Sequence, residues 1–498
     1  MSNSSIQNTR LFTYTLVSLT ILGLAAIWYP RFPAMQDYPQ SLFMAHVVSS
    51  FTDTGFNWSA YYRPNQHIGP YSLFFMMVSL LAKIVPVEVA GKVFISLAVC
   101  LTTVFIYVWN RSHATDHPAW SILLLFPFLF SQVYYMGFVN YLISIPLLFL
   151  ALLVHEKLVK QGGNAGTIIS YLALLIVLFL SHPYTILVFI ILSFIISLFS
   201  SVTKKQLVIG LAGPLLIVLL FTLWYVNMFG ISPAQRPGAF NIRWLPAPDV
   251  VAYFLLPFAG MRITSSPNIM LLLAWSMIAM LFVFAWRKQK SSIRLRSPLL
   301  IMLLLSIAGY AILPFWLGDY SYFNLRMSIV CYFLLALTLG GIQLGKWSGY
   351  VFVILVCLIM LMTIRTQMAL SAETEELLPL FGHMNKNEVV YSLTLDASPA
   401  EIDKRYFYQF HEHDHFYYHI LVGGGAASTL FNSKMNQIQL KEGIAMPNIF
   451  AEPEFYQYIL VRGQLPREQL FARTHKSIAR SAAWQLYERY NTGQHPEK

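Results

Sequence analysis

Long apolar runs separated by short polar stretches fill the first three-quarters of the chain. Most of them approach or exceed the ~17–25 residues that a helix needs to cross a bilayer. One further apolar piece, 118–131, is shorter, and we interpret it as a half-span or re-entrant helix that does not cross. The pattern predicts spans near 11–29, 69–84, 90–110, 133–153, 167–181, 184–200, 206–227, 268–286, 297–316, 325–343 and 348–365.

The distribution of positive charge predicts which loops face the cytoplasm. The run 11–29 ends in Trp28-Tyr29-Pro30 and has no small-residue cleavage site, so we expect an uncleaved first span with a cytoplasmic N-terminus. With 118–131 not crossing, the basic run 287–296 becomes cytoplasmic. All nine lysines before residue 366 then share that face: Lys83, Lys92, Lys157, Lys160, Lys204, Lys205, Lys288, Lys290 and Lys346.

The opposite, outer face would carry arginines and aspartates on its loops. The predicted outer arginines are Arg31, Arg63, Arg111, Arg236, Arg243, Arg262, Arg326 and Arg365, and the predicted outer aspartates are Asp37, Asp53, Asp116, Asp249 and Asp319. The planar fork of arginine suits bidentate contact with phosphate. Local pairing with the aspartates or lipid headgroups is the other interpretation of any single arginine. As a set, they indicate an anionic ligand at the outer surface.

From about Ser371 the chain changes character. Residues 366–498 hold 15 of the 22 acidic residues. A helical pattern at Ala372–Phe381 precedes strand-like runs at Val389–Leu395, Phe455–Val461 and Trp484–Tyr490. The predicted fold is therefore a polytopic α-helical membrane domain, 1–365, with about 11 spans and one half-span, followed by a small extracytoplasmic α/β domain, 366–498.

Composition excludes a soluble protein, because 57% of residues are hydrophobic and only 11% are charged, against about 25% charged in soluble domains. The formal charge of +11 falls mostly at span ends, so it indicates topology rather than a nucleic-acid partner. Cys100, Cys331 and Cys357 lie inside apolar runs, which predicts no disulfide framework and no thiolate metal site.

Asp37 is the first acidic residue of the chain and stands between Pro33 and Pro39 in the first outer loop, 30–68. Apolar residues in Pro39–Phe51 have helical spacing, which predicts a helix lying along the membrane interface. Asp37 would directly precede that helix, where aspartate is a favoured cap. The residues alone leave two interpretations open, a helix cap and a catalytic base.

Other polar residues are predicted at the same face as substrate-binding candidates. Arg63 and His67 crowd against the second predicted span, Asn140 lies at the outer end of another, and His182 lies in a tight outer hairpin. Arg243 belongs to loop 228–267, which could cover a lipid-facing groove. Arg326 enters a span at membrane depth, so it requires a partner, either an aspartate or a ligand phosphate.

A distal run of histidines, His411 to His419, suggests a metal site. Zinc would need three or four convergent ligands. The neighbouring tyrosines and phenylalanines fit an aromatic, interface-like surface equally well. We therefore predict no metal ligands, and the sequence leaves a divalent metal open.

The order of these features resembles the GT-C superfamily of membrane glycosyltransferases, which use polyprenyl-phosphate sugars. An uncleaved span leads into Asp37-Tyr38-Pro39 and an interfacial helix. A bundle with Asn324-Leu325-Arg326 entering a late span and an extracytoplasmic C-terminal domain follow. The resemblance covers the layout of roughly 1–365.

The resemblance implies that Asp37 is the general base on the acceptor and that Arg326 contacts the lipid phosphate. Tyr38 stands where a second acid would follow, which argues against a metal-dependent subtype. No cofactor is then needed besides the lipid-linked sugar. The implied setting is the cytoplasmic (inner) membrane, and the acceptor would be an envelope glycan, lipid or protein. A transporter or flippase of lipid-linked saccharide and a non-catalytic envelope assembly protein are the alternatives.

Overall fold

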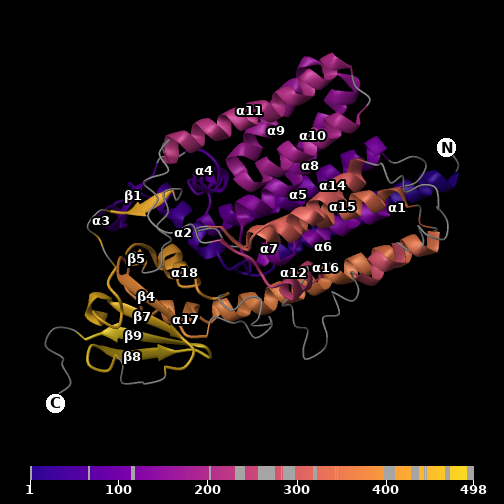
Figure 1. Cartoon of the computed structure of the whole chain (residues 1–498). Coiled ribbons are helices and arrows are strands. Elements are labelled where there is room, and N and C mark those ends of the chain that lie inside the picture. The colour runs from indigo at the N-terminus through magenta and orange to yellow at the C-terminus, as the bar shows by residue number, and fades with distance from the viewer. Residues whose placement is uncertain are drawn as a thin grey trace.

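The computed structural model describes residues 3–65, 68–113, 118–200, 203–229, 242–255, 275–281, 283, 298–317, 322–342, 344, 346–396, 410–427, 437–441, 444, 446–465 and 471–490. A helical bundle occupies most of the molecule, and a small sheet at one end carries the C-terminal part of the chain (Figure 1). The predicted cytoplasmic loop 287–296 and most of the predicted span 268–286 lie outside the described residues.

The long bundle helices are apolar along their length. Within the described residues, five stretches are long and apolar enough to cross a membrane: Thr9–Trp28, Val87–His113, Val139–Gln161, Gln206–Asn227 and Trp347–Phe381. Shorter apolar helices accompany them, so the chain is a multi-pass membrane protein. The bundle helices are α1 (Asn3–Trp28), α5 (Val87–His113), α8 (Val139–Gln161), α9 (Ala165–Ser181), α10 (Pro183–Phe199), α11 (Lys204–Phe229), α12 (Ala247–Leu255), α14 (Pro298–Ile312), α15 (Phe323–Thr338) and α16 (Lys346–Glu375).

Helices α1 and α5 pack side by side in opposite directions. Thr20 and Thr103 are joined by a 2.8 Å hydrogen bond, and Trp28 Nε1 donates to Ser96 Oγ at 2.9 Å. Everything between these helices therefore begins and ends at the same end of the bundle. We call it the Asp37 end, because the loop that carries Asp37 lies there.

The segment between α1 and α5 holds α2 (Tyr38–Ser49), α3 (Trp58–Tyr61), β1 (Tyr62–Pro64) and α4 (Ser72–Leu81). Helix α4 replaces the predicted span 69–84. It has 10 residues and is thus about 15 Å long, half of the ~30 Å hydrocarbon core. The prediction that 69–84 spans the membrane is therefore wrong.

The segment 118–135 crosses the bundle instead. It begins at the opposite end of the bundle, where the centre of the Trp120 ring lies 5.6 Å from the centre of the Phe12 ring. Its end reaches the Asp37 end, where the Tyr135 carbonyl accepts a 2.8 Å hydrogen bond from the Gln36 N–H. The interpretation of 118–131 as non-crossing is therefore wrong. The segment is broken into a 3₁₀ turn (Trp120–Leu124), α6 (Leu125–Leu129) and α7 (Gln132–Tyr135).

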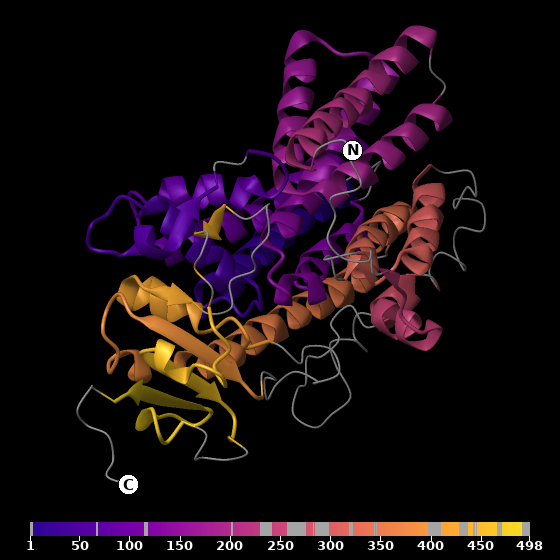
Figure 2. The same cartoon turned by 60° about the vertical axis from the view of Figure 1, so that its left-hand side comes forward.

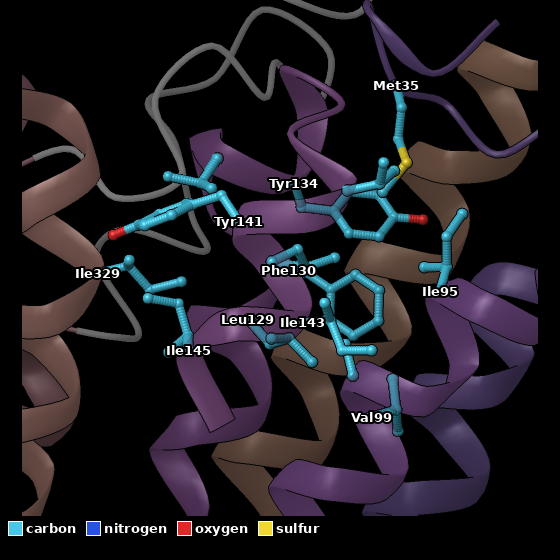
Figure 3. Close-up of a cluster of buried hydrophobic side chains, with 14 of the residues drawn as sticks. Met35, Ile95, Val99, Leu129, Phe130, Tyr134, Tyr141, Ile143, Ile145 and Ile329 are labelled. Atoms are coloured by element: carbon cyan, nitrogen blue, oxygen red, sulfur yellow. The ribbon is translucent and has the colours of Figure 1, made fainter. Parts of the chain in front are cut away.

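Burial explains how a broken segment can cross. Protein surrounds it, and broken helices are tolerated at membrane depth when they are buried in protein. Leu129, Phe130 and Tyr134 lie among side chains of the neighbouring helices, Val99 and Ile143 among them (Figure 3). Because the breaks shorten each apolar helix, the sequence pattern underestimated this element.

One predicted crossing is removed and another is added, so the predicted side of every element after residue 135 is unchanged. The residues between the two segments change sides. Lys92 Nζ donates to the Pro30 carbonyl at 2.7 Å, and Glu88 lines a cavity together with Asp53. Lys83, Glu88 and Lys92 therefore lie at the Asp37 end and not at the opposite end. Arg111, in the last turn of α5, moves the other way. At that opposite end His113 lies 3.3 Å from Glu156.

The C-terminal part forms a five-stranded mixed sheet of order β5-β4-β7-β9-β8. Its strands β4, β7 and β9 lie close to the three predicted strand-like runs. Helix α16 runs unbroken from the opposite end to Glu375, so the helix continues through the predicted boundary at 365 (Figure 2). The elements are α17 (Leu378–Phe381), β4 (Val389–Thr394), α18 (Phe416–Tyr418), a π-helical turn (His419–Gly423), β5 (Ala426–Ala427), β6 (Ile438–Leu440), β7 (Tyr458–Arg462), β8 (His475–Arg480) and β9 (Trp484–Arg489).

The first loop and the C-terminal part are joined by many polar contacts. Strand β1 pairs with β6, and Asn57 Nδ2 donates to the Asn387 carbonyl at 2.9 Å. Helix α2 corresponds to the predicted interfacial helix, but most of its residues are buried against α4, α5 and α18. The segment between α1 and α4 therefore lies between the bundle and the C-terminal part of the chain.

The corrected topology predicts a labelling pattern. In a variant lacking the three native cysteines, Lys83→Cys and Asp53→Cys should react with a membrane-impermeant thiol reagent from the same side. Lys160→Cys, exposed at the other end, should react only from the opposite side. Labelling of residues 83 and 160 from one side would contradict this arrangement.

Candidate functional site

Asp37 occupies the N-cap position of α2, yet its side chain makes no capping hydrogen bond. The capping interpretation of its carboxylate therefore does not hold. Its backbone is fixed instead by the turn that precedes α8. Gln36 N donates to the Tyr135 carbonyl at 2.8 Å, and Asp37 N donates to the Met136 carbonyl at 3.1 Å.

Gly137 makes this close approach possible. Its φ of +78° is a left-handed conformation that favours glycine. A Cβ at this position would lie 2.7 Å from the backbone nitrogens of both Asp37 and Tyr38. Helix α16 fixes the other side of the loop, since Phe32 N donates to Ser371 Oγ at 3.1 Å and Ala34 N to Gln367 Oε1 at 3.0 Å.

Arg326 lies in the first turn of α15 and is buried. Its guanidinium carbon is 4.5 Å from the centre of the Phe138 ring, one residue after Gly137. Tyr141 donates its hydroxyl hydrogen to the Arg326 carbonyl. Among the described residues, Arg326 Nε is a buried donor with no hydrogen-bond acceptor. The turn at 136–138 thus holds Asp37 on one side and Arg326 on the other.

The Asp37 carboxyl is half-buried, with 28% of its side chain exposed. Burial raises its pKa, and the nearby Glu412 carboxylate raises it further. The positive charge of Arg326 and a hydrogen bond from Gln36 oppose this, and the resulting pKa is about 7. A carboxyl with this pKa exchanges a proton near neutral pH, which is the property of a general base.

A histidine from the C-terminal part of the chain also contacts Asp37. His413 Nε2 lies 3.7 Å from Asp37 Oδ1, and only 2% of the His413 side chain is exposed. Burial lowers the pKa of His413 to about 4, although Asp414 opposes the shift. The imidazole is therefore neutral at pH 7, and the contact is between a carboxyl and a neutral ring.

A buried ionic network fixes the segment that carries Glu412 and His413. His411 Nδ1 lies 2.7 Å from Asp414 Oδ2, and its Nε2 lies 3.1 Å from Glu373 Oε2. Glu373 Oε2 in α16 also forms an ion pair with Arg462 Nη2 from β7, at 3.0 Å. Burial disfavours the charge on His411, but Asp414 and Glu373 more than compensate, so its pKa is raised. The segment is thus tied to both the bundle and the sheet.

The histidines of the run 411–419 are buried inside the protein. His415 and His419 are buried beside Phe416 and Tyr418, and His419 Nδ1 lies 2.8 Å from the Gly424 carbonyl. In the part of the chain that the structure describes, no group of three or more His, Cys, Asp or Glu residues is arranged to hold a metal ion.

Two other predicted residues lie close to Arg326 and shape the site. His182 caps α10, where its Nδ1 accepts from Tyr184 N at 3.1 Å, and its ring contacts Tyr71 and Tyr141. Asn140 accepts from Phe74 N at 2.9 Å and donates to the Tyr71 carbonyl at 3.0 Å. The amide oxygen and nitrogen of Asn140 therefore hold the chain at Phe74 and at Tyr71, and Tyr71 has a positive φ of 71°.

The remaining predicted residues are placed elsewhere or outside the description. Arg63 is an exposed residue of β1 and donates to Gln439 at 3.0 Å. Arg243 is an exposed residue of β2 (Ile242–Arg243), which pairs with β3 (Trp316–Leu317). Neither is among the charged neighbours that shift the pKa of Asp37. His67 lies outside the described residues.

The sequence reasoning missed Glu412 and His413. Their segment was conspicuous for its histidines, but it was interpreted as a distal metal site or an aromatic surface. The signal available was a run of titratable residues within an otherwise aromatic stretch, which marks a buried polar segment. Nothing in the sequence connects residue 413 with residue 37.

Two solved structures have a similar overall fold. ArnT from Cupriavidus metallidurans bound to undecaprenyl phosphate superposes with a TM-score of 0.56 at 9% identity, covering 98% of this chain and 100% of that one. Its apo structure gives 0.53 at 10% identity, covering 98% and 99%. The chain therefore has an ArnT-like fold. The resemblance predicted from the sequence is thereby confirmed at the level of the ArnT-like fold. No protein-family model and no curated protein matches the sequence.

The glycine in the 136–138 turn gives a test of how the site is held. Gly137→Ala should lower the thermal midpoint of unfolding, because the new Cβ meets two backbone nitrogens and the φ is unfavourable. The expected cost is about 1–3 kcal/mol. Gly162→Ala is the matched control, since Gly162 also has a positive φ but nothing lies within 4 Å of its Cβ position. An equal loss in both variants would show that strain, and not the contact with Asp37, sets the cost.

Proposed function

We propose that this protein transfers a sugar from a polyprenyl-phosphate donor to an acceptor hydroxyl, with Asp37 as the general base. The observation that carries the proposal is a carboxyl with a pKa of about 7 at one end of an ArnT-like bundle, with a buried arginine in electrostatic contact. ArnT itself has been solved with undecaprenyl phosphate bound. The likeness extends to fold alone, so the assignment rests on the chemistry of these residues.

The acceptor side of the reaction is assigned to Asp37. The acceptor oxygen attacks the anomeric carbon while its proton moves to the Asp37 carboxylate. The bond from the anomeric carbon to the phosphate oxygen breaks, and the polyprenyl phosphate leaves with the bonding electrons. A base with a pKa near the working pH is suited to this proton transfer.

The donor side is assigned to Arg326. Its unmatched Nε donor and its charge would bind the lipid phosphate and stabilise the negative charge that develops as the phosphate leaves. Because the leaving group is already a phosphate that arginine stabilises, we propose no cofactor besides the lipid-linked sugar. His182 and Asn140 would support this side by fixing Tyr71 and Tyr141 around Arg326.

The cellular setting follows from the same proposal. We place the Asp37 end at the outer face of the cytoplasmic membrane, with the N-terminus in the cytoplasm and the sheet outside. Lys157, Lys160 and Lys204 then lie on the cytoplasmic side, as the positive-inside rule favours. The acceptor would be an envelope glycan, lipid or protein. Arg63, Arg243 and His67 remain proposed contacts for its more distant parts.

Removal of the base tests the reaction. Asp37→Asn should lower kcat at least 100-fold, the scale of general-base catalysis, in a transfer assay with purified full-length protein in lipid and a panel of undecaprenyl-phosphate sugars. The stability of the Asp37→Asn variant is the control. Because the folded pKa of about 7 lies above the unfolded value of 3.8, ionisation of Asp37 lowers the stability of wild type as pH rises between these two values, and the loss is complete above pH 7. The variant should therefore be at least as stable as wild type at alkaline pH. Full transfer activity in Asp37→Asn would refute the assignment.

The pH dependence has a definite sign. The carboxylate is the active form, so kcat/KM should rise with pH and level off above an apparent pKa of about 7. One unit below that value, the rate should be roughly a tenth of the plateau. A rate that is flat across the neutral range would contradict a titrating Asp37.

Arg326 is tested by binding. Arg326→Ala should weaken binding of undecaprenyl phosphate about tenfold or more, because a charge-assisted bond contributes roughly 1.5–3 kcal/mol. Arg63→Ala, on the exposed β1 strand, is the matched arginine control and should bind the lipid phosphate normally. An unchanged dissociation constant in Arg326→Ala would remove this residue from the donor site.

A further inference from the structure

The reaction centre is not made by the membrane bundle alone. Asp37 comes from the loop after α1, and Arg326 comes from α15. Two further groups, Glu412 and His413, come from a turn near the C-terminus more than 370 residues after Asp37. We propose that this C-terminal turn completes the catalytic site, with Glu412 as a charge partner and His413 as a positioning residue for Asp37. The inference rests on the proposed function.

The geometry of His413 supports a positioning role. Its Nε2 is 3.7 Å from Asp37 Oδ1, and its ring is almost completely buried. The centre of the Phe416 ring lies 5.9 Å from the centre of the His413 ring. A neutral, confined imidazole limits the orientations open to the carboxylate without neutralising it. Correct orientation of a reacting group is a large part of catalytic advantage.

Glu412 directly precedes His413, whose Nε2 lies 3.7 Å from the Asp37 carboxylate, and it supplies a second negative charge near the base. When the acceptor proton reaches Asp37, one of the two neighbouring charges disappears and their repulsion is relieved. The pair therefore makes Asp37 a stronger base than a single carboxylate would be. Arg326 acts in the opposite direction, and these groups, with neutral His413, are the charged and titratable neighbours that face Asp37 from α15 and from the 410–415 turn.

The turn is built to hold these two residues in place. His411 and Asp414, on either side of them, belong to the buried network with Glu373 of α16 and Arg462 of β7. Thr374 Oγ1 also donates to Asp414 Oδ2 at 2.9 Å. This network explains why a site residue can lie on a turn, because the turn is tied to the same helix that fixes residues 32–34.

The charge partner is tested without requiring a known sugar. The carbonyl stretch of the protonated Asp37 carboxyl, identified by its loss in Asp37→Asn, is followed by infrared spectroscopy during a pH titration of the full-length protein in lipid. Glu412→Gln should lower the titration midpoint by roughly one unit, the scale on which nearby charges act. Glu388→Gln is the matched control, a glutamate whose pKa burial also raises but which lies beside Arg489, and it should leave the midpoint unchanged. An unchanged midpoint in Glu412→Gln would overturn the pairing.

His413 is tested by kinetics. His413→Ala should lower kcat about tenfold with little change in the donor KM, and His413→Asn should recover part of the loss, because the amide can still contact the carboxylate. A loss in KM alone, or no loss, would overturn the positioning role. The two proposals fail separately. If Asp37→Asn is active, the proposed base is refuted. If Asp37→Asn is inactive and Glu412→Gln leaves the Asp37 titration midpoint unchanged, only the contribution of the C-terminal turn is refuted.

Discussion

Two backbone hydrogen bonds at one glycine turn support the rest of the site. The N–H groups of Gln36 and Asp37 donate to the carbonyls of Tyr135 and Met136, and Gly137 leaves room for them. The turn that receives Asp37 continues into Phe138, whose ring lies against Arg326. A carboxyl group and a guanidinium from distant parts of the sequence are therefore brought into electrostatic contact by a main-chain connection.

The electrostatics of Asp37 depend on where that connection places it. A carboxylate in water would have a pKa near 4, as acids at exposed positions do. At the protein surface between the bundle and the sheet, Asp37 loses water and gains the neighbouring Glu412, and its pKa rises to about 7. Arg326 limits the rise, so the proton remains exchangeable near neutral pH. Burial, Glu412 and Arg326 therefore set the pKa of Asp37 together.

Much of this architecture could be predicted from the sequence, and the failures have physical reasons. Apolar periodicity located the long helices, since crossing a bilayer imposes a length that a sequence displays. It failed for Ser72–Leu81, whose apolar flanks made a short helix look long, and for 118–135, whose breaks are tolerated only because protein surrounds them. Asp37 and Arg326 could be singled out as candidates from the sequence because a charge near or within a membrane needs a reason. Glu412 and His413 were not, because their importance lies in a tertiary contact that leaves no mark on local sequence.

The pairing of β1 with β6 has a consequence for biosynthesis. These strands join residues 62–64 to residues 438–440, and the groups around Asp37 come from both ends of the chain. The early helices can form as they emerge from the ribosome, but the pairing of β1 with β6 and the contact of His413 with Asp37 cannot form until residues 413–440 have been made. Chains that stop before residue 413 would thus have the early helices but lack both contacts, so the surroundings of Asp37 are completed late in synthesis.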